Sequence, residues 1–128
     1  MIELVTKGIK ISVKTNYNGS SYRNNRLHHV FSYTISITNQ SENKVKLTDR
    51  FWKIFDSQNQ TEIVSGEGVV GQTPILEPND HYTYKSGCFL TSNIGAMKGF
   101  YTMINLETYE QFKVYIPTFQ LTTTALLN

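Results

Sequence analysis

The chain has 128 residues, the size of one domain, and a formal charge of only +2 at pH 7. This balance, without a run of Lys or Arg, gives no reason to expect binding to nucleic acid or to an anionic membrane. The single cysteine, Cys88, excludes an intrachain disulfide and a zinc site built on several cysteines, and no segment approaches about 18 consecutive apolar residues. We therefore expect a cytoplasmic protein without membrane spans, in which residues 1–128 form one domain.

Apolar and polar residues alternate along most of the chain, which is the pattern of β-strands with one buried face. In 30–38, for example, Phe31, Tyr33, Ile35 and Ile37 would face inward. The predicted strands lie at about 8–14, 30–38, 45–55, 63–64, 81–87, 96–106 and 109–117.

The alternation changes phase where Phe51 and Trp52 follow one another, so we expect a bulge near Arg50. The polar run 56–62 reads as a hairpin turn. About seven short strands separated by turn residues predict an all-β fold, an antiparallel β-sandwich of the immunoglobulin-like or fibronectin type III-like kind. Residues 122–128 are expected to form a frayed tail.

Three glycines, Gly66, Gly68 and Gly71, match the G-x-G-x-x-G pattern of dinucleotide-binding loops. That mechanism needs a helix N-terminus directly after the last glycine, because its free N–H groups hold the pyrophosphate. Pro74 and Pro78 leave too little room for such a helix. The sequence therefore excludes the dinucleotide site and predicts that these glycines serve bulges or close chain approach.

A second interpretation of the same segment stays open. Successive N–H groups around glycines can form an anion-binding nest without a helix. The candidate anion-binding residues are Gly66, Gly68, Gly71 and Arg50, and the ligand would be a phosphate-containing small anion.

No set of residues indicates catalysis or metal binding. His28 and His29 are adjacent, so on a strand they point to opposite faces and cannot share a metal ion. The carboxylates show no spacing typical of an acid–base pair, and Cys88 lies in an apolar context that favours a small buried side chain. We expect no enzyme activity, no metal and no cofactor.

A long motif resembles the ApaG family, also called CorD. It runs through "GEGVVGQTPILEPNDHYTYKSGCFLTSNIGAMKGFYTM", with "RFWKIFD" before it and "IPTFQL" after it. The matching positions include Val69, Val70, Leu76, Tyr84, Ser86, Leu90, Gly95, Met97, Gly99 and Tyr101.

This resemblance implies a fibronectin type III-like sandwich in a cytoplasmic protein of a family linked by name to cobalt and magnesium tolerance, with no established enzymatic activity. In eukaryotic relatives the domain resembles a protein-recognition module. We therefore predict a non-enzymatic binding module, a monomer or homodimer, whose partner is an unidentified protein or peptide held by a sheet face or an edge strand. The alternative is a sensor of phosphate or nucleotide anions that uses the Gly66–Gly71 loop.

Overall fold

The computed structural model of the protein describes residues 1–123, which form β-strands arranged in two sheets. Within this range the chain contains no helix that could cross a membrane. The strands are β1 (Ile2–Thr6), β2 (Ile9–Arg23), β3 (Arg26–Asn39), β4 (Val45–Asp56), β5 (Glu62–Glu67), β6 (Ile75–Leu76), β7 (His81–Leu90), β8 (Ile94–Asn105) and β9 (Gln111–Thr122).

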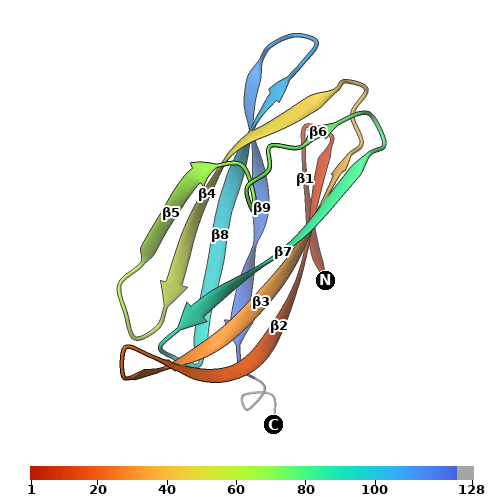
Figure 1. Cartoon of the computed structure of the whole chain (residues 1–128). Coiled ribbons are helices and arrows are strands. Elements are labelled where there is room, and N and C mark those ends of the chain that lie inside the picture. Colours follow the sequence, from red (N-terminus) through yellow and green to blue (C-terminus); the bar gives the residue numbers. More distant parts are fainter. Residues whose placement is uncertain (124–128) are drawn as a thin grey trace.

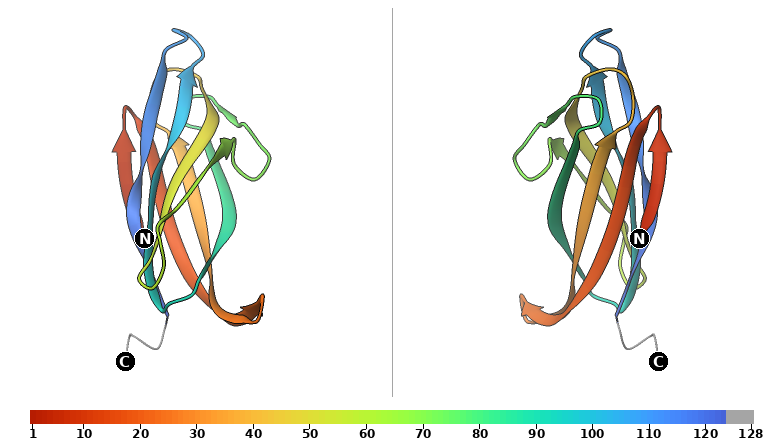
Figure 2. Two further views of the ribbon diagram at one scale, coloured as in Figure 1. Left: turned by 90° about the vertical axis from the view of Figure 1, so that its left-hand side faces the viewer. Right: turned by 90° about the vertical axis from the view of Figure 1, so that its right-hand side faces the viewer.

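The two sheets lie face to face as two layers (Figures 1 and 2). One has the strand order β1-β2-β3-β7 and the other β5-β4-β8-β9, with β6 paired to the start of β4. All strand pairs are antiparallel. The predicted all-β antiparallel sandwich is confirmed.

Residues 1–123 contain nine strands, where the sequence predicted about seven. The predicted seven correspond to β2–β5 and β7–β9, and the two that were missed are short. Strand β1 turns back onto β2 at Lys7 and Gly8, whose φ angles of 49° and 82° form a tight two-residue turn. Strand β6 has only two residues, opposite Val45 and Lys46.

The core lies between the layers and is built from the alternating residues of both sheets. The residues of 30–38 predicted to face inward are buried as expected, and in the strand predicted at 8–14 the alternating residues Ile9, Ile11 and Val13 are buried. Full burial of one large aliphatic side chain stabilises the fold by roughly 1.5–3 kcal/mol. The largest fully buried side chains are Tyr101, Phe31, Ile9, Ile11, Ile35, Ile37, Leu47, Leu90, Met97, Met103, Leu121 and Val13.

The predicted bulge lies at Thr48, two residues before Arg50. The register of β4 against β8 shifts between Leu47 and Asp49. Because one extra residue on a strand reverses which residues face inward, Trp52 after the bulge is buried and only 3% exposed. Arg50 lies on the same face of β4 as Trp52, because the two residues are two apart on the strand after the bulge.

A carboxylate fixes the corner where β4 ends. Asp56 accepts hydrogen bonds from the backbone N–H of Thr91 at 2.7 Å, the Thr91 hydroxyl at 2.8 Å and the Ser92 hydroxyl at 2.5 Å. Burial alone would raise the pKa of Asp56, but these bonds outweigh it and lower the pKa to about 2. The corner therefore ties the β4–β5 hairpin to the turn between β7 and β8.

The two long sides of the sandwich differ. On one side β1 packs against β9, and the Tyr115 N–H donates to the Thr6 hydroxyl at 3.3 Å. On the other side lie the free edges of β5 and β7, each of which pairs with one strand only. We refer to the β5–β7 side as the open side.

The end of β9 is better ordered than the predicted tail. Thr122 is part of the strand, and the Thr123 N–H donates to the Asn93 carbonyl at 3.2 Å. The prediction of fraying from residue 122 is therefore wrong for these two residues, because the turn before β8 supplies a partner. The rest of the predicted tail, 124–128, lies outside the described residues.

Candidate functional site

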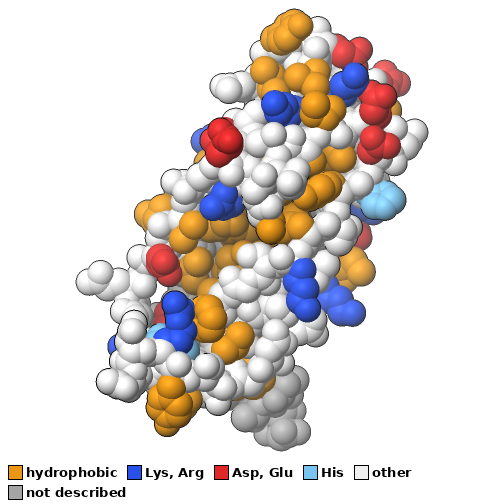
Figure 3. Space-filling model, viewed as in Figure 1, with side chains coloured by type: hydrophobic (Ala, Val, Ile, Leu, Met, Phe, Trp, Pro, Cys, Tyr) orange, Lys and Arg blue, Asp and Glu red, His pale blue; other side chains and the backbone are white. Residues whose placement is uncertain are grey.

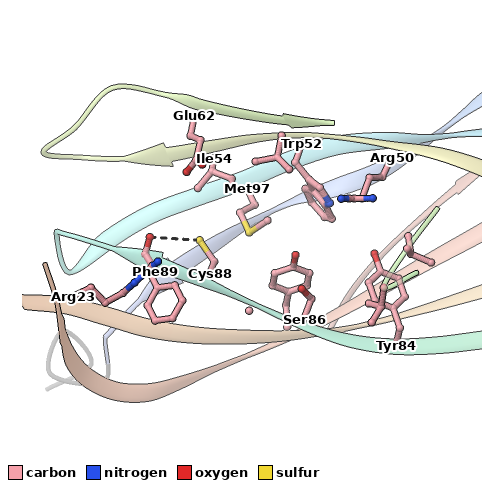
Figure 4. A pocket seen from close by; sticks show the side chains of 15 residues that line it. Arg23, Arg50, Trp52, Ile54, Glu62, Tyr84, Ser86, Cys88, Phe89 and Met97 are labelled. Atoms are coloured by element: carbon pink, nitrogen blue, oxygen red, sulfur yellow. Dashed lines mark hydrogen bonds between the residues drawn. The ribbon is translucent and has the colours of Figure 1, made fainter. Parts of the chain in front are cut away.

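A cleft of about 440 Å³ lies between the sheets on the open side. We call it the edge cleft; β4 and β5 form one wall and β7 the other (Figure 4). Figure 3 shows hydrophobic side chains gathered along the middle of this side of the molecule, flanked by Lys and Arg groups. An open groove bordered by two unpaired strand edges is the geometry at which an extended segment can be added to a sheet.

The middle of the edge cleft is apolar. Trp52, Val64, Cys88 and Met97 line it. The Trp52 ring lies 5.6 Å from the Tyr33 ring, centroid to centroid, so the indole is held by packing. Burial raises the pKa of the Cys88 thiol to about 12, so this cysteine is a protonated apolar side chain and not a nucleophile. The prediction that Cys88 is a small buried residue is confirmed.

Arg50 marks one end of the edge cleft. Its Nη1 donates to the carbonyl oxygens of Glu67 and Gly68, each at 3.0 Å. The guanidinium rests on Gly66, where a Cβ would lie 3.2 Å from its two terminal nitrogens, so a larger residue here would require the guanidinium to shift by a few tenths of an ångström. No carboxylate lies within ion-pair distance of Arg50 among residues 1–123.

Tyrosine hydroxyls lie beside this end. Tyr33 and Tyr84 line the edge cleft, and the Tyr84 and Tyr101 hydroxyls share a hydrogen bond. Burial raises the pKa of all three phenols. They are therefore neutral at physiological pH and can donate or accept hydrogen bonds, but they supply neither a nucleophile nor a negative charge.

The other end of the edge cleft carries a second arginine. The Arg23 guanidinium lies 4.0 Å from the centre of the Phe89 ring, a cation–π contact. Glu62 of β5 lines the same end (Figure 4). Opposite charges thus coexist here, whereas the Arg50 end has a cation alone.

The segment after Gly66 forms a tight turn and not a helix start. Val69 and Gln72 exchange two backbone hydrogen bonds, of 2.8 and 2.9 Å. The two residues between them, Val70 and Gly71, have φ angles of 47° and 77°, and a positive φ is costly for a β-branched residue. Gly68 also has a positive φ of 67°, and a Cβ there would lie 2.2 Å from the Gln72 carbonyl oxygen. The prediction that no helix follows Gly71 is confirmed.

The four predicted anion-binding residues lie on two segments, the β4–β5 pair and the turn that follows β5. Arg50 and Gly66 face each other across the β4–β5 pair. Gly68 directs its carbonyl to Arg50 and donates its N–H to Thr48 at 2.8 Å, while a Cβ on Gly71 would meet open space. The N–H groups that the nest interpretation requires are thus partly used inside the chain, and the Arg50 side chain is the more available donor.

The β7 wall of the edge cleft was not predicted. Ser86 and Gly87 belong to the predicted strand 81–87, and Ser86 also to the family motif, yet neither is among the predicted site residues; both line the edge cleft. The alternation of β7 predicts which of its residues face inward, but not that its edge lies across from β5. A local signal in this strand is the pair of large side chains Tyr82 and Tyr84, which their two-residue spacing puts on one face.

The histidines lie apart from the edge cleft centre. The His29 ring and the Tyr17 hydroxyl are hydrogen-bonded at 2.9 Å, His28 contacts its own hairpin through the Arg26 carbonyl, and His81 is exposed. Over the described part of the chain, no three side chains of His, Cys, Asp or Glu gather as metal ligands would.

Comparison with known proteins identifies the family. The family model of the ApaG domain matches residues 19–105. The Protein ApaG of Shewanella woodyi is 43% identical over 128 residues, which covers 100% of both chains. The Protein ApaG of Brucella suis is 39% identical over 121 residues, covering 94% of this chain and 92% of the relative.

Solved structures give the same result. An X-ray structure of a Northeast Structural Genomics Consortium target is 40% identical with a TM-score of 0.88, covering 94% of this chain and 91% of that one. A crystal structure of a Bordetella pertussis protein that carries the name ApaA is 32% identical with a TM-score of 0.83, covering 97% and 98%. The chain therefore belongs to the ApaG family.

Proposed function

We propose that this protein is a non-enzymatic binding module that takes an extended segment of a partner protein along the free edge of β7, with alternate side chains of that segment in the edge cleft. The observation that carries the proposal is the cleft itself, which joins an apolar interior to an unpaired strand edge. Backbone groups of an edge strand give affinity by pairing, and the adjoining pocket selects side chains.

The chemistry of the cleft supports binding over catalysis. Its thiol is protonated and its phenols are neutral, because burial raises the pKa of each. Its apolar middle and aromatic walls are the surface that anchors large side chains in protein interfaces. A protein partner in the cytoplasm is the setting we propose.

Two matched variants test this proposal. Val64 and Ile63 are neighbours on β5, but Val64 lines the cleft and Ile63, 60% exposed, lies on the opposite face. We expect Val64→Trp to fill the cleft and to weaken binding of peptides selected from a displayed random library at least tenfold, as measured by fluorescence anisotropy. Ile63→Trp adds the same bulk outside the cleft and should leave the affinity unchanged.

Binding should also shift the backbone amide NMR signals of β7 more than those of β1. A library that yields no binder to the native chain would refute the proposal, and so would equal binding by both tryptophan variants. Urea unfolding of each variant provides the control for folding.

A second candidate function is a sensor of phosphate-containing anions at the Arg50 end. The observation in its favour is a guanidinium without a carboxylate partner in residues 1–123, beside the Gly66–Gly71 loop. Pyrophosphate or ATP at millimolar concentration should then shift the amide signals of Gly66, Gly68 and Gly71. Unchanged spectra would remove this candidate.

A further inference from the structure

The edge cleft has a cationic position and an apolar position side by side, and this arrangement specifies the chemistry of its occupant, given the proposed peptide-binding function. Arg50 and Trp52 both reach into the cleft from β4 (Figure 4). They are two residues apart on one strand, a spacing of about 6.6–6.8 Å. Alternate side chains of an extended segment have the same spacing. One extended segment can therefore place one side chain against Arg50 and the side chain two residues away against Trp52.

The Arg50 guanidinium has a free edge. A guanidinium carries five N–H donors, and the bonds to Glu67 and Gly68 both come from Nη1. No hydrogen bond from Nε or Nη2 to another described residue is found, and these two nitrogens together can bind both oxygens of one carboxylate. Because the two carbonyls already fix the side chain, little conformational entropy is lost when it binds.

The distribution of charge favours an acidic group at this end. Among the described residues that line the edge cleft, Glu62 is the sole carboxylate. Glu62 is four residues from Gly66 on β5, and Gly66 is opposite Arg50, so Glu62 lies about 13 Å along the strands from the Arg50 position. A carboxylate of a bound segment placed at Arg50 would thus be stabilised by the guanidinium and only weakly repelled by Glu62.

The neighbouring position is apolar. Trp52 and Met97 line the cleft beside Cys88, and the neutral thiol adds no charge. A large aliphatic or aromatic side chain buried there would be worth roughly ten- to hundredfold in affinity.

We propose that the edge cleft recognises an extended protein segment in which one Asp or Glu and one large apolar side chain are separated by a single residue. The carboxylate binds the Nε–Nη2 edge of Arg50, and the apolar side chain contacts Trp52 and Met97. The segment lies beside β7 as an added strand.

Peptide selection tests the sequence pattern. A displayed random library selected on the native chain should be enriched in peptides that carry one acidic and one large apolar residue separated by a single residue, and the same library selected on Arg50→Gln should lose the acidic position but keep the apolar one. Lys53→Gln removes one cation from the outer face of the same strand and should select the same sequences as the native chain.

Defined peptides test the carboxylate directly. In one selected host sequence, a peptide with Asp and Phe separated by a single residue should bind the native chain roughly ten- to hundredfold more tightly than its counterpart with Asn in place of Asp, measured by NMR titration. This ratio should fall to near one in Arg50→Gln and be intermediate in Arg50→Lys, which keeps the positive charge but not the two parallel N–H donors of the guanidinium.

The outcomes separate this inference from the proposed function. Selected peptides that bind in the cleft without a difference between Asp and Asn would overturn the inference alone. The absence of any selected binder would overturn the proposed function as well. Arg50 also holds the Glu67 and Gly68 carbonyls, so its replacement could change the conformation of the loop. The Gly68 amide signal of each variant is therefore compared with that of the native chain. If Arg50→Gln disturbs the loop, Arg50→Lys supplies the test.

Discussion

Removal of the Asp56 charge should destabilise the protein in a pH-dependent manner. The carboxylate accepts three hydrogen bonds from Thr91 and Ser92, and a weaker fourth from the Gln58 N–H at 3.2 Å. Asp56→Asn keeps the shape of the side chain but removes the charge and one acceptor oxygen. The Ser92 hydroxyl, in a residue only 3% exposed, then loses its strongest partner.

The magnitude follows from the pKa. The pKa of Asp56 is lowered from 3.8 to about 2, and a change of this size corresponds to roughly 2 kcal/mol in the free energy of unfolding at neutral pH. Solvent screening of a partly exposed carboxylate brings the expected loss to about 1–2 kcal/mol. Because the folded-state pKa is the lower one, this contribution is present in full above about pH 5 and is lost as the pH falls through 4 toward 2.

Urea unfolding of the native chain and of Asp56→Asn at several pH values measures this. We expect Asp56→Asn to be less stable by about 1–2 kcal/mol at pH 7 and the difference to shrink to about half at pH 3. Asp49→Asn removes a charge from an exposed position of the same strand and should change stability by less than about 0.5 kcal/mol. A difference for Asp56→Asn that is equally large at pH 7 and pH 3 would refute the electrostatic reasoning.

Three further predictions concern packing and backbone geometry. Gly99→Ala should cost more than about 3 kcal/mol in urea unfolding or prevent folding, because a Cβ would lie 2.0 Å from the Phe51 carbonyl oxygen; Gly71→Ala, with open space but a φ of 77°, should cost only about 1 kcal/mol. A thiol reagent at pH 8 should modify Cys88 at least about a hundredfold more slowly in the folded chain than in guanidinium, because burial raises its pKa to about 12; equal rates would contradict this. Val70→Asn should raise the free energy of unfolding in urea by about 1 kcal/mol, since Asn tolerates a positive φ better than a β-branched residue, and a lower free energy of unfolding would show that Val70 makes contacts worth more than the strain.

The fold was largely predictable because period-two alternation is a local signal. It identified the seven longer strands and the inward residues of β2 and β3. The bulge was predicted within two residues of its place, since Phe51 beside Trp52 breaks the alternation. The two short strands escaped prediction because a two-residue strand has no period, and because β1 has no buried residue and so lacks the alternation of a buried and an exposed face.

The site was predictable only in part. Arg50 and Gly66 could be joined from the sequence because they belong to one hairpin, which a short turn defines. The opposite wall at Ser86 and Cys88 belongs to a strand in the other sheet, and the alternation of a strand gives its inward face but not the edge that lies opposite it. The pairing of Arg50 with the Glu67 and Gly68 carbonyls likewise depends on the turn geometry at Val70, which the sequence would not have favoured.

The unpaired edge of β7 has a consequence for solubility. An edge strand of ten residues could join the same strand of another copy and begin aggregation. Lys85, near the middle of β7, is exposed, and antiparallel joining of two copies about this residue would place two ammonium groups directly opposite each other. A partner segment without a lysine at that place meets no such repulsion, so the edge remains accessible to a foreign strand while disfavouring fibril growth.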